Sequence, residues 1–206
     1  MARMGEHITD LNRVGGHVAL DFVNTADRDA GVVIIDWLHS YADLLAWAHT
    51  GGLLSDALLM QLQQHSAAAP DEAVAAYTQA HALREALYAV GSAIAGGRAI
   101  PPDALALIND LLVESAAQRQ LVAEGGVVRW GWLHGDAQLR YPLWVIVQSA
   151  TEVLTMQVGL LRECAGDECG WLFLDTSRNH SRRWCDMRDC GNREKARRHY
   201  RRMTGS

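Results

Sequence analysis

The sequence predicts a mostly helical α+β protein that ends in a small zinc-binding module. Apolar residues recur at helical spacings over most of the first 160 residues, with one short strand-like interruption. All 4 cysteines lie in the last 43 residues, in two close pairs. A chain of 206 residues is long enough for one large domain and a small module, and we place them at residues 8–160 and 161–206.

The first ordered element is predicted in the stretch "GGHVALDFVNT". Val18, Leu20 and Phe22 alternate as in a strand, whereas the same stretch also has apolar residues at helical spacing. We favour a helix that begins near Ala19.

Four further helices are predicted before residue 120, from apolar periodicity and from the residues that begin and end helices. Serine, aspartate and proline favour the first turn of a helix, and glycine commonly ends one. The predicted spans are Trp37–His49 behind the cap Asp36, a short helix from Ser55 to about His65, a long helix from Pro70 to Gly96, and one from Pro101 to about Arg119.

The pattern changes at "QLVAEGGVVRWGW", where two short apolar runs flank Gly125 and Gly126, which predicts a β-hairpin. Pro142 then opens an apolar helix that we expect to run to Glu163 and to lead directly into Cys164. Polar residues interrupt its apolar stretch, so a buried helix explains it better than a membrane span. A helix of this length would fix the orientation of the zinc module relative to the first domain.

The cysteine spacing is Cys164-x4-Cys169, fifteen residues, then Cys185-x4-Cys190. Two close pairs at a medium separation are typical of tetrahedral zinc, and four thiolates leave no open position for chemistry at the metal. Two disulfides or four unrelated buried thiols are the alternatives, but the pairing and the lack of a secretion signal favour one structural Zn²⁺ per chain.

The segment between the pairs, "GWLFLDTSRNHSRRW", is interpreted as a hairpin, and "GNREKARRHYRRM" after Cys190 as a helix. Together they predict a treble-clef-like or ribbon-like finger ending in a basic helix. Thr176–Ser206 holds 10 basic and 3 acidic residues, a net charge of +7, although the whole chain carries −5.

Like charges four residues apart weaken a helix, and an anionic partner would offset this repulsion. Zinc combined with an arginine-rich helix is a frequent phosphate-binding arrangement, so we predict DNA binding. A solvated basic face, or a face docked on the acidic part of its own chain, is the alternative. The predicted contacts are Arg182, Arg183, Arg193, Lys195, Arg197, Arg198, Arg201 and Arg202.

A candidate ligand site in the first domain comprises Asp21, Asn24 and Thr25, with His81 and Arg84 as partners from the long helix. On a helix these first three would present a carboxylate, an amide and a hydroxyl to a pocket. The alternative is a capping network in which all of them have protein partners. No catalytic motif or phosphate-binding glycine loop is present in the sequence, so we expect no enzymatic activity.

The residues Cys190-Gly191-Asn192-Arg193 and the stretch "CGWLFLDTSRNHSRRWC" resemble the bacterial CGNR zinc-finger family. The stretches "ALDFVNT" and "LREAL" resemble the ABATE domain that precedes this finger in family members. The resemblance implies a stress-induced transcription regulator whose N-terminal domain senses a ligand. It also implies that the four cysteines are the zinc ligands.

We therefore expect a DNA-binding transcription regulator controlled by an unknown small effector. The N-terminus lacks an apolar signal core, so we expect a cytoplasmic protein without a membrane segment. A lone finger covers little DNA, which favours a homodimer joined through the first domain. The alternatives are an RNA-binding or protein-docking zinc module, or an enzyme with a small-molecule site near Asp21, Asn24 and Arg84.

Overall fold

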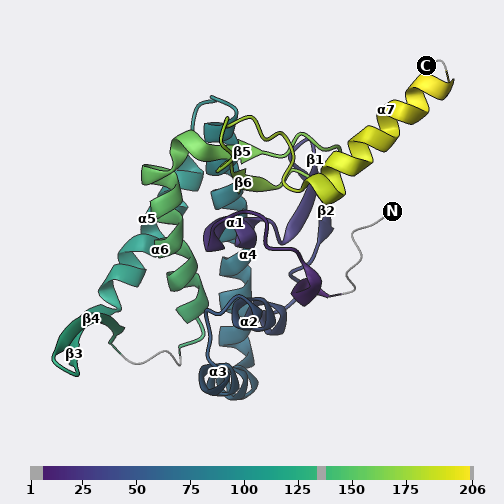
Figure 1. The fold of residues 1–206 in the computed structure, drawn as a ribbon. Coiled ribbons are helices and arrows are strands. Elements are labelled where there is room, and N and C mark those ends of the chain that lie inside the picture. The colour runs from purple at the N-terminus through teal and green to yellow at the C-terminus, as the bar shows by residue number, and fades with distance from the viewer. Residues whose placement is uncertain (1–6, 134–137, 205–206) are drawn as a thin grey trace.

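The computed structural model describes residues 7–133 and 138–204. Its centre is the long helix α4, around which the other helices of the first domain are arranged (Figure 1). None of the described helices is long and apolar enough to cross a membrane. The helices of this domain are α1 (Val18–Val23), α2 (Tyr41–Thr50), α3 (Asp56–Ala68), α4 (Pro70–Ala95), α5 (Pro102–Ala117) and α6 (Tyr141–Met156).

The described strands form three separate antiparallel hairpins, which confirms the α+β class. They are β1 (Ala26–Asp29) with β2 (Val32–Asp36), β3 (Arg119–Glu124) with β4 (Val127–Trp132), and β5 (Leu161–Glu163) with β6 (Leu172–Leu174). The short turns are η1 (Ile8–Asp10), η2 (Val158–Leu160) and the π-helical η3 (Met187–Gly191), and the chain continues into α7 (Asn192–Thr204).

Several predicted helix ends and turns are confirmed by their local geometry. The Ser55 hydroxyl accepts a hydrogen bond from the Leu58 amide at 3.3 Å and so caps α3. Gly96 ends α4. In the β3–β4 turn, Gly125 and Gly126 have φ values of 58° and 79°, as a two-residue hairpin turn requires.

The predicted helix over Trp37–His49 is wrong at its beginning. Asp36 is the last residue of β2, and α2 begins at Tyr41 behind Ser40, whose hydroxyl accepts from the Asp43 amide at 3.2 Å. Local capping signals did not reveal the β1–β2 hairpin, because its first strand carries charged residues that are rare in buried strands.

The predicted helix from Pro142 to Glu163 is also wrong at its end. Helix α6 ends at Met156, the turn η2 follows, and Leu161–Glu163 form β5. These residues leave the helix because β5 pairs with β6, so a tertiary contact outweighs local helix propensity. The zinc module is therefore not carried on a continuous helix.

Strand β6 is buried on both faces. Leu172 and Leu174 pack into the large core of the helical domain together with Leu161, whereas Trp171 and Phe173 pack against the four cysteines. The sequence predicted that the apolar residues of β6 form a hairpin with the later residues up to Trp184. In the structure, β6 pairs instead with the preceding strand β5.

Polar contacts hold this hairpin to the first domain. The Asn24 side-chain amide donates to the Leu172 carbonyl and accepts from the Leu172 amide, each at 2.8 Å. The Leu174 amide donates to the Gly15 carbonyl at 2.9 Å. A Cβ atom at Gly91 of α4 would lie 2.6 Å from Leu172 Cδ1, so the absence of a side chain there allows the close approach.

Asn24→Ala is expected to lower the free energy of unfolding by about 2–4 kcal/mol, because it leaves two buried backbone groups of Leu172 unpaired. Urea denaturation followed by circular dichroism measures this loss. Asn109→Ala on the exposed side of α5 is the matched control and is expected to change stability by less than about 0.5 kcal/mol. An equal effect of the two substitutions would contradict the role given to Asn24.

Candidate zinc centre and basic helix

The first pair of cysteines lies on the loop between β5 and β6. The Cys164 amide donates to the Trp171 carbonyl at 2.8 Å, which closes the base of this loop. Glu168 has a φ of 55°, and a Cβ at Gly166 would lie 3.3 Å from the Cys190 sulfur. The loop therefore turns tightly and lets the second pair approach.

The second pair lies at the π-helical turn that precedes α7, with one cysteine before the turn and one within it. Asp186 begins this turn, since its carboxylate accepts from the Arg188 amide at 2.8 Å and its carbonyl accepts from the Gly191 amide at 3.0 Å. Cys185 therefore lies before the turn and Cys190 within it, and both sulfurs face the first loop.

The four sulfur atoms form a compact cluster that fits one zinc ion. All of them lie within 4.8 Å of one another, and the Sγ atoms of Cys169 and Cys190 each lie 3.7 Å from that of Cys185. Zinc–sulfur bonds of about 2.3 Å in a tetrahedron give sulfur–sulfur distances of about 3.8 Å. The cysteines are free thiols, since a disulfide bond would be about 2.05 Å long.

All four cysteines are buried, which makes four thiolates without a cation costly. Hydrogen bonding with the neighbouring thiols, Cys164 foremost, raises the pKa of Cys185, and burial raises it further. A divalent cation removes this penalty and ionises the ligands. The donor set is complete with four sulfurs, so the centre is a structural one.

Two of the predicted DNA contacts support this centre instead of facing solvent freely. Arg193 Nη2 donates to the Cys190 sulfur at 3.0 Å, and its Nε lies 3.1 Å from the Asp189 carboxylate. Arg182 donates from Nε to the Trp184 carbonyl at 2.9 Å and from Nη2 to the Cys185 carbonyl. Both arginines orient ligand residues, a role that sequence spacing did not distinguish from phosphate binding.

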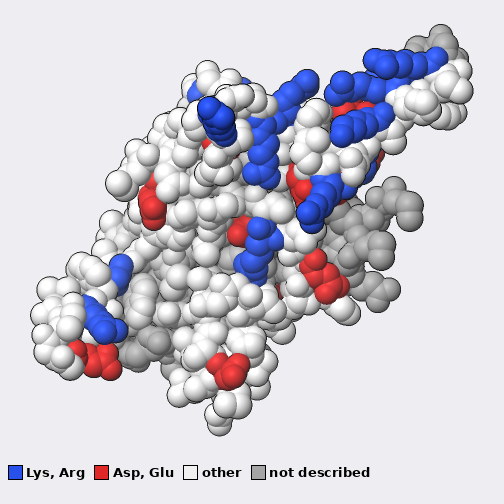
Figure 2. All heavy atoms as spheres, in the orientation of Figure 1, with Lys and Arg blue, Asp and Glu red and all other residues white. Residues whose placement is uncertain are grey.

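Helix α7 points away from the rest of the molecule (Figure 1). In the same orientation, Figure 2 shows basic side chains along this helix and over the neighbouring loops. Arg197 pairs with Asp167 of the first cysteine loop, and Arg198 with Glu194 at 3.1 Å. The exposed members of the predicted set are Arg183, Lys195, Arg198, Arg201 and Arg202.

Three of the five predicted ligand-site residues of the first domain come together around a partly buried ion pair. Arg84 donates to both carboxylate oxygens of Asp36 at 2.7 Å, and its Nη1 also lies 3.3 Å from the Thr25 hydroxyl. His81 Nε2 donates to the Leu38 carbonyl, so its Nδ1 accepts from Arg84. Burial alone would raise the pKa of Asp36, but the Arg84 guanidinium outweighs this effect and leaves the pKa lowered.

The other two residues lie elsewhere. The Asn24 side-chain amide is hydrogen-bonded to the backbone of Leu172, and Asp21 accepts a hydrogen bond from the Gly15 amide at 2.9 Å. Burial raises the pKa of Asp21, and this hydrogen bond opposes the shift. All five predicted residues thus have protein partners, as in the capping-network alternative.

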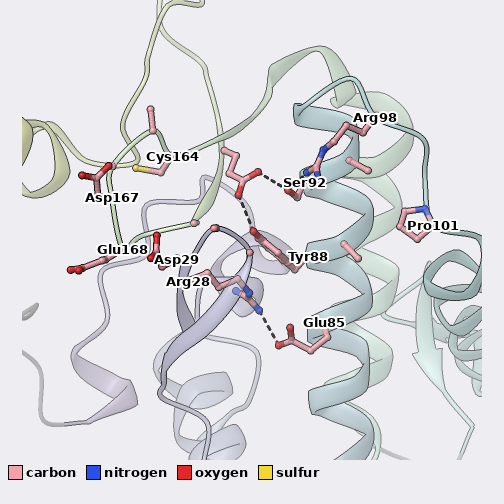
Figure 3. Close-up of a pocket in the computed structure, with 18 of the residues that line it drawn as sticks. Arg28, Asp29, Glu85, Tyr88, Ser92, Arg98, Pro101, Cys164, Asp167 and Glu168 are labelled. Carbon is pink, nitrogen blue, oxygen red and sulfur yellow. Dashed lines mark hydrogen bonds and ion pairs between the residues drawn. The ribbon is translucent and has the colours of Figure 1, made fainter.

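A large cleft of about 970 Å³ lies instead at the junction of the two domains. Its walls come from the β1–β2 turn, from α4 and the loop after it, and from the first cysteine loop (Figure 3). None of the five predicted ligand-site residues lines it. No local sequence pattern indicates this cleft, because its walls come from three segments far apart in the chain.

Besides this cleft, sequence reasoning also missed the structural role of Asp175, which follows β6 and is fully buried. Its carboxylate accepts from the backbone amides of Ser177 and Arg182 at 3.0 and 2.9 Å. It therefore orders the loop that connects β6 to the second cysteine pair, and it lies within the segment "GWLFLDTSRNHSRRW" between the two pairs.

The fold and site define a helical domain joined to a four-cysteine zinc finger with a basic terminal helix. Residues 16–157 match the ABATE family model, described as "Putative stress-induced transcription regulator", and residues 161–203 match the CGNR zinc finger. Since the first match spans more than half of the chain, the protein belongs to the ABATE family. No curated protein matches the chain. The finger holds one structural zinc ion, with Cys164, Cys169, Cys185 and Cys190 as ligands.

Zinc removal is expected to affect the two cysteine loops unequally. The amides of Leu172 and Leu174 donate to groups of the first domain and should keep their protection from hydrogen exchange. The amides of Arg188 and Gly191 bond only within the second loop and should lose protection, because zinc supplies about 10–16 kcal/mol in small fingers. Hydrogen exchange with a strong chelator measures the difference.

Restoring zinc is the control and should restore protection in the second loop. Elemental analysis should find one zinc ion per chain before chelation and none in Cys185→Ser. Simultaneous loss of protection in both loops would show that β6 depends on zinc and not on the first domain.

Proposed function

We propose that the protein is a transcription regulator without enzymatic activity that binds DNA through α7 and is controlled by a small ligand. The observation that supports DNA binding best is the position of α7. The zinc centre fixes the start of this helix through Cys190 and Arg193, while the rest projects from the molecule with its basic side chains exposed.

The dimensions of α7 suit the major groove of duplex DNA. Its 13 residues give a length of about 20 Å at 1.5 Å per residue, and the groove is about 12 Å wide. Lys195, Arg198, Arg201 and Arg202 are exposed along it and are the proposed DNA contacts. Arg183 is exposed near its base and is a proposed phosphate anchor.

A helix docked on its own chain would explain the basic charge without DNA. The ion pair between Arg197 and Asp167 reaches the first cysteine loop, but the exposed side chains nearer the end of α7 extend beyond the body (Figure 2). This arrangement favours an external anionic partner. RNA remains the alternative partner, and competition between duplex DNA and single-stranded RNA distinguishes the two.

Binding to duplex DNA is expected to weaken with salt, with a slope of log K against log salt of about −4 to −5 if four to six phosphates are neutralised. Arg201→Ala with Arg202→Ala should reduce the magnitude of this slope by about 2. Fluorescence anisotropy over a salt series measures both values.

Arg129→Ala, on the exposed part of β4, is the matched control and should leave the slope unchanged. Affinity that does not depend on salt, or an equal loss in the control, would contradict the assignment of α7. Tighter binding of single-stranded RNA than of duplex DNA would favour the RNA-binding alternative.

We also propose a homodimer, joined through the β3–β4 hairpin of the first domain. Leu121, Val128 and Trp130 lie on one face of this hairpin and are 63%, 64% and 62% exposed. Within the described chain, the outer edge of β3 pairs with no other strand. Antiparallel pairing of β3 with a second copy about a two-fold axis at Leu121 places the two Leu121 side chains opposite each other on one face.

Leu121→Lys is expected to convert the dimer to a monomer, because it places like charges close together across the two-fold axis. Sedimentation velocity measures the oligomeric state. Val113→Lys on α5, where the side chain is 72% exposed, is the control and should leave the dimer intact. A monomeric wild-type chain at micromolar concentration would contradict the proposed dimer.

A further inference from the structure

The cleft at the domain junction belongs neither to the zinc ligands' closed coordination shell nor to the exposed face of α7. Helix α4 contributes Tyr88 and Ser92 to one wall, and the first cysteine loop contributes Asp167 and Glu168 to the opposite wall (Figure 3). A molecule bound there contacts both domains at once.

The cleft is lined by more acidic than basic side chains. The acidic residues are Asp29, Glu85, Glu163, Asp167 and Glu168, and the basic residues are Arg28 and Arg98, which gives 5 negative and 2 positive charges and a net charge of −3. A recess with an excess of one charge concentrates ligands of the opposite charge. The net charge therefore favours a cationic ligand.

The charge of Arg28 is already balanced within the protein. Its side chain is buried, its Nη2 lies 2.9 Å from the Glu85 carboxylate, and its guanidinium lies 4.0 Å from the centre of the Tyr88 ring. Arg28 is thus part of the floor and is not available to bind an anion. Asp167 pairs with Arg197 of α7, so the surplus negative charge remains on Asp29, Glu163 and Glu168.

Glu163 is held in place by two neutral donors. The hydroxyls of Tyr88 and Ser92 donate to its two carboxylate oxygens at 2.9 and 2.6 Å, and both donors belong to buried residues. Hydroxyl donors orient a carboxylate without cancelling its charge. Arg98 donates to the Ser92 hydroxyl at 2.6 Å, so it lies one hydrogen bond away from Glu163.

Small apolar residues separate the charged groups. They are Ala30, Ala89, Ala93, Ala99, Ala165 and Pro101. Side chains of this size leave room for an alkyl chain to lie between acidic groups on different walls. Most sugars and nucleotides would leave these apolar surfaces or the acidic groups without a complementary partner.

We propose that this cleft binds a small flexible organic cation, a diamine or polyamine whose ammonium groups pair with carboxylates on both walls. The assignment deepens the ligand control in the proposed function, and binding itself does not depend on DNA. Glu163 directly precedes the zinc ligand Cys164, and Asp167 pairs with Arg197 of α7. A bound cation thus contacts the two residues that connect the cleft to the zinc centre and to α7.

The test is isothermal titration of the zinc-loaded full chain with spermidine and with putrescine, without DNA. One saturable site per chain is expected. Asp29→Asn with Glu168→Gln should weaken spermidine binding by about tenfold, since two exposed ion pairs are lost. Zinc content and thermal unfolding confirm that this variant is folded.

Asp110→Asn with Glu72→Gln is the matched control, because it removes the same charge from exposed positions outside the cleft. It should weaken binding by less than about twofold. An equal effect of both variants would show attraction to the overall acidic surface and would overturn the site. Absence of saturable binding would overturn it as well.

Lysine and glutarate serve as probes of the ligand class. Lysine bears a carboxylate that the net negative charge should reject, and glutarate bears two. Binding of glutarate as tightly as putrescine would overturn the assignment to amines and point to anion binding at Arg98. Binding of lysine as tightly as putrescine would overturn the selection by net negative charge. Because no arm contains DNA, a failure of the DNA-binding proposal appears separately, in the salt series alone.

Discussion

Burial of the short strand β6 on both faces is the constraint on which the arrangement of the two domains depends. Strands β5 and β6 have three residues each, and a hairpin of that length is not stable alone in water. It is held by leucines in the helical core, by Trp171 and Phe173 against the cysteines, and by the two-way hydrogen bond from Asn24. The first cysteine loop is therefore positioned by the helical domain.

The position of α7 depends on this hairpin through the zinc centre. The first cysteine loop fixes two ligands relative to the helical core, and zinc fixes the other two relative to the first. Cys190 lies in the turn that continues into α7, and Arg193 in the first turn of α7 contacts its sulfur. The direction of the basic helix thus follows from a series of contacts that begins in the first domain.

Local sequence patterns predicted the features that depend on neighbouring residues. The cysteine spacing gave the metal ligands, Ser55 and Gly96 marked helix ends, and Gly125 with Gly126 marked a hairpin turn. Each of these signals acts within a few residues of the structure that it specifies.

Features that depend on distant residues were missed or misplaced. Asn24 and Leu172 are separated by 148 positions, so no local pattern shows that this amide holds β6. The pairing of β5 with β6 keeps Leu161–Glu163 out of the preceding helix, so α6 ends at Met156 although the apolar periodicity continues. Arg28 is charged yet buried, because Glu85 and the Tyr88 ring enclose it, and such a strand resembles a surface loop in sequence.

The two-sided burial of β6 limits how this finger can be exchanged between proteins. The family models divide the chain between residues 157 and 161, but Leu161, Leu172 and Leu174 lie beyond that division and complete the core before it. Another domain joined to this finger would need a groove that accepts these leucines. It would also need a glycine at the position of Gly91 and a side-chain amide at that of Asn24. The boundary between the two family matches therefore does not coincide with the boundary of the folded helical core.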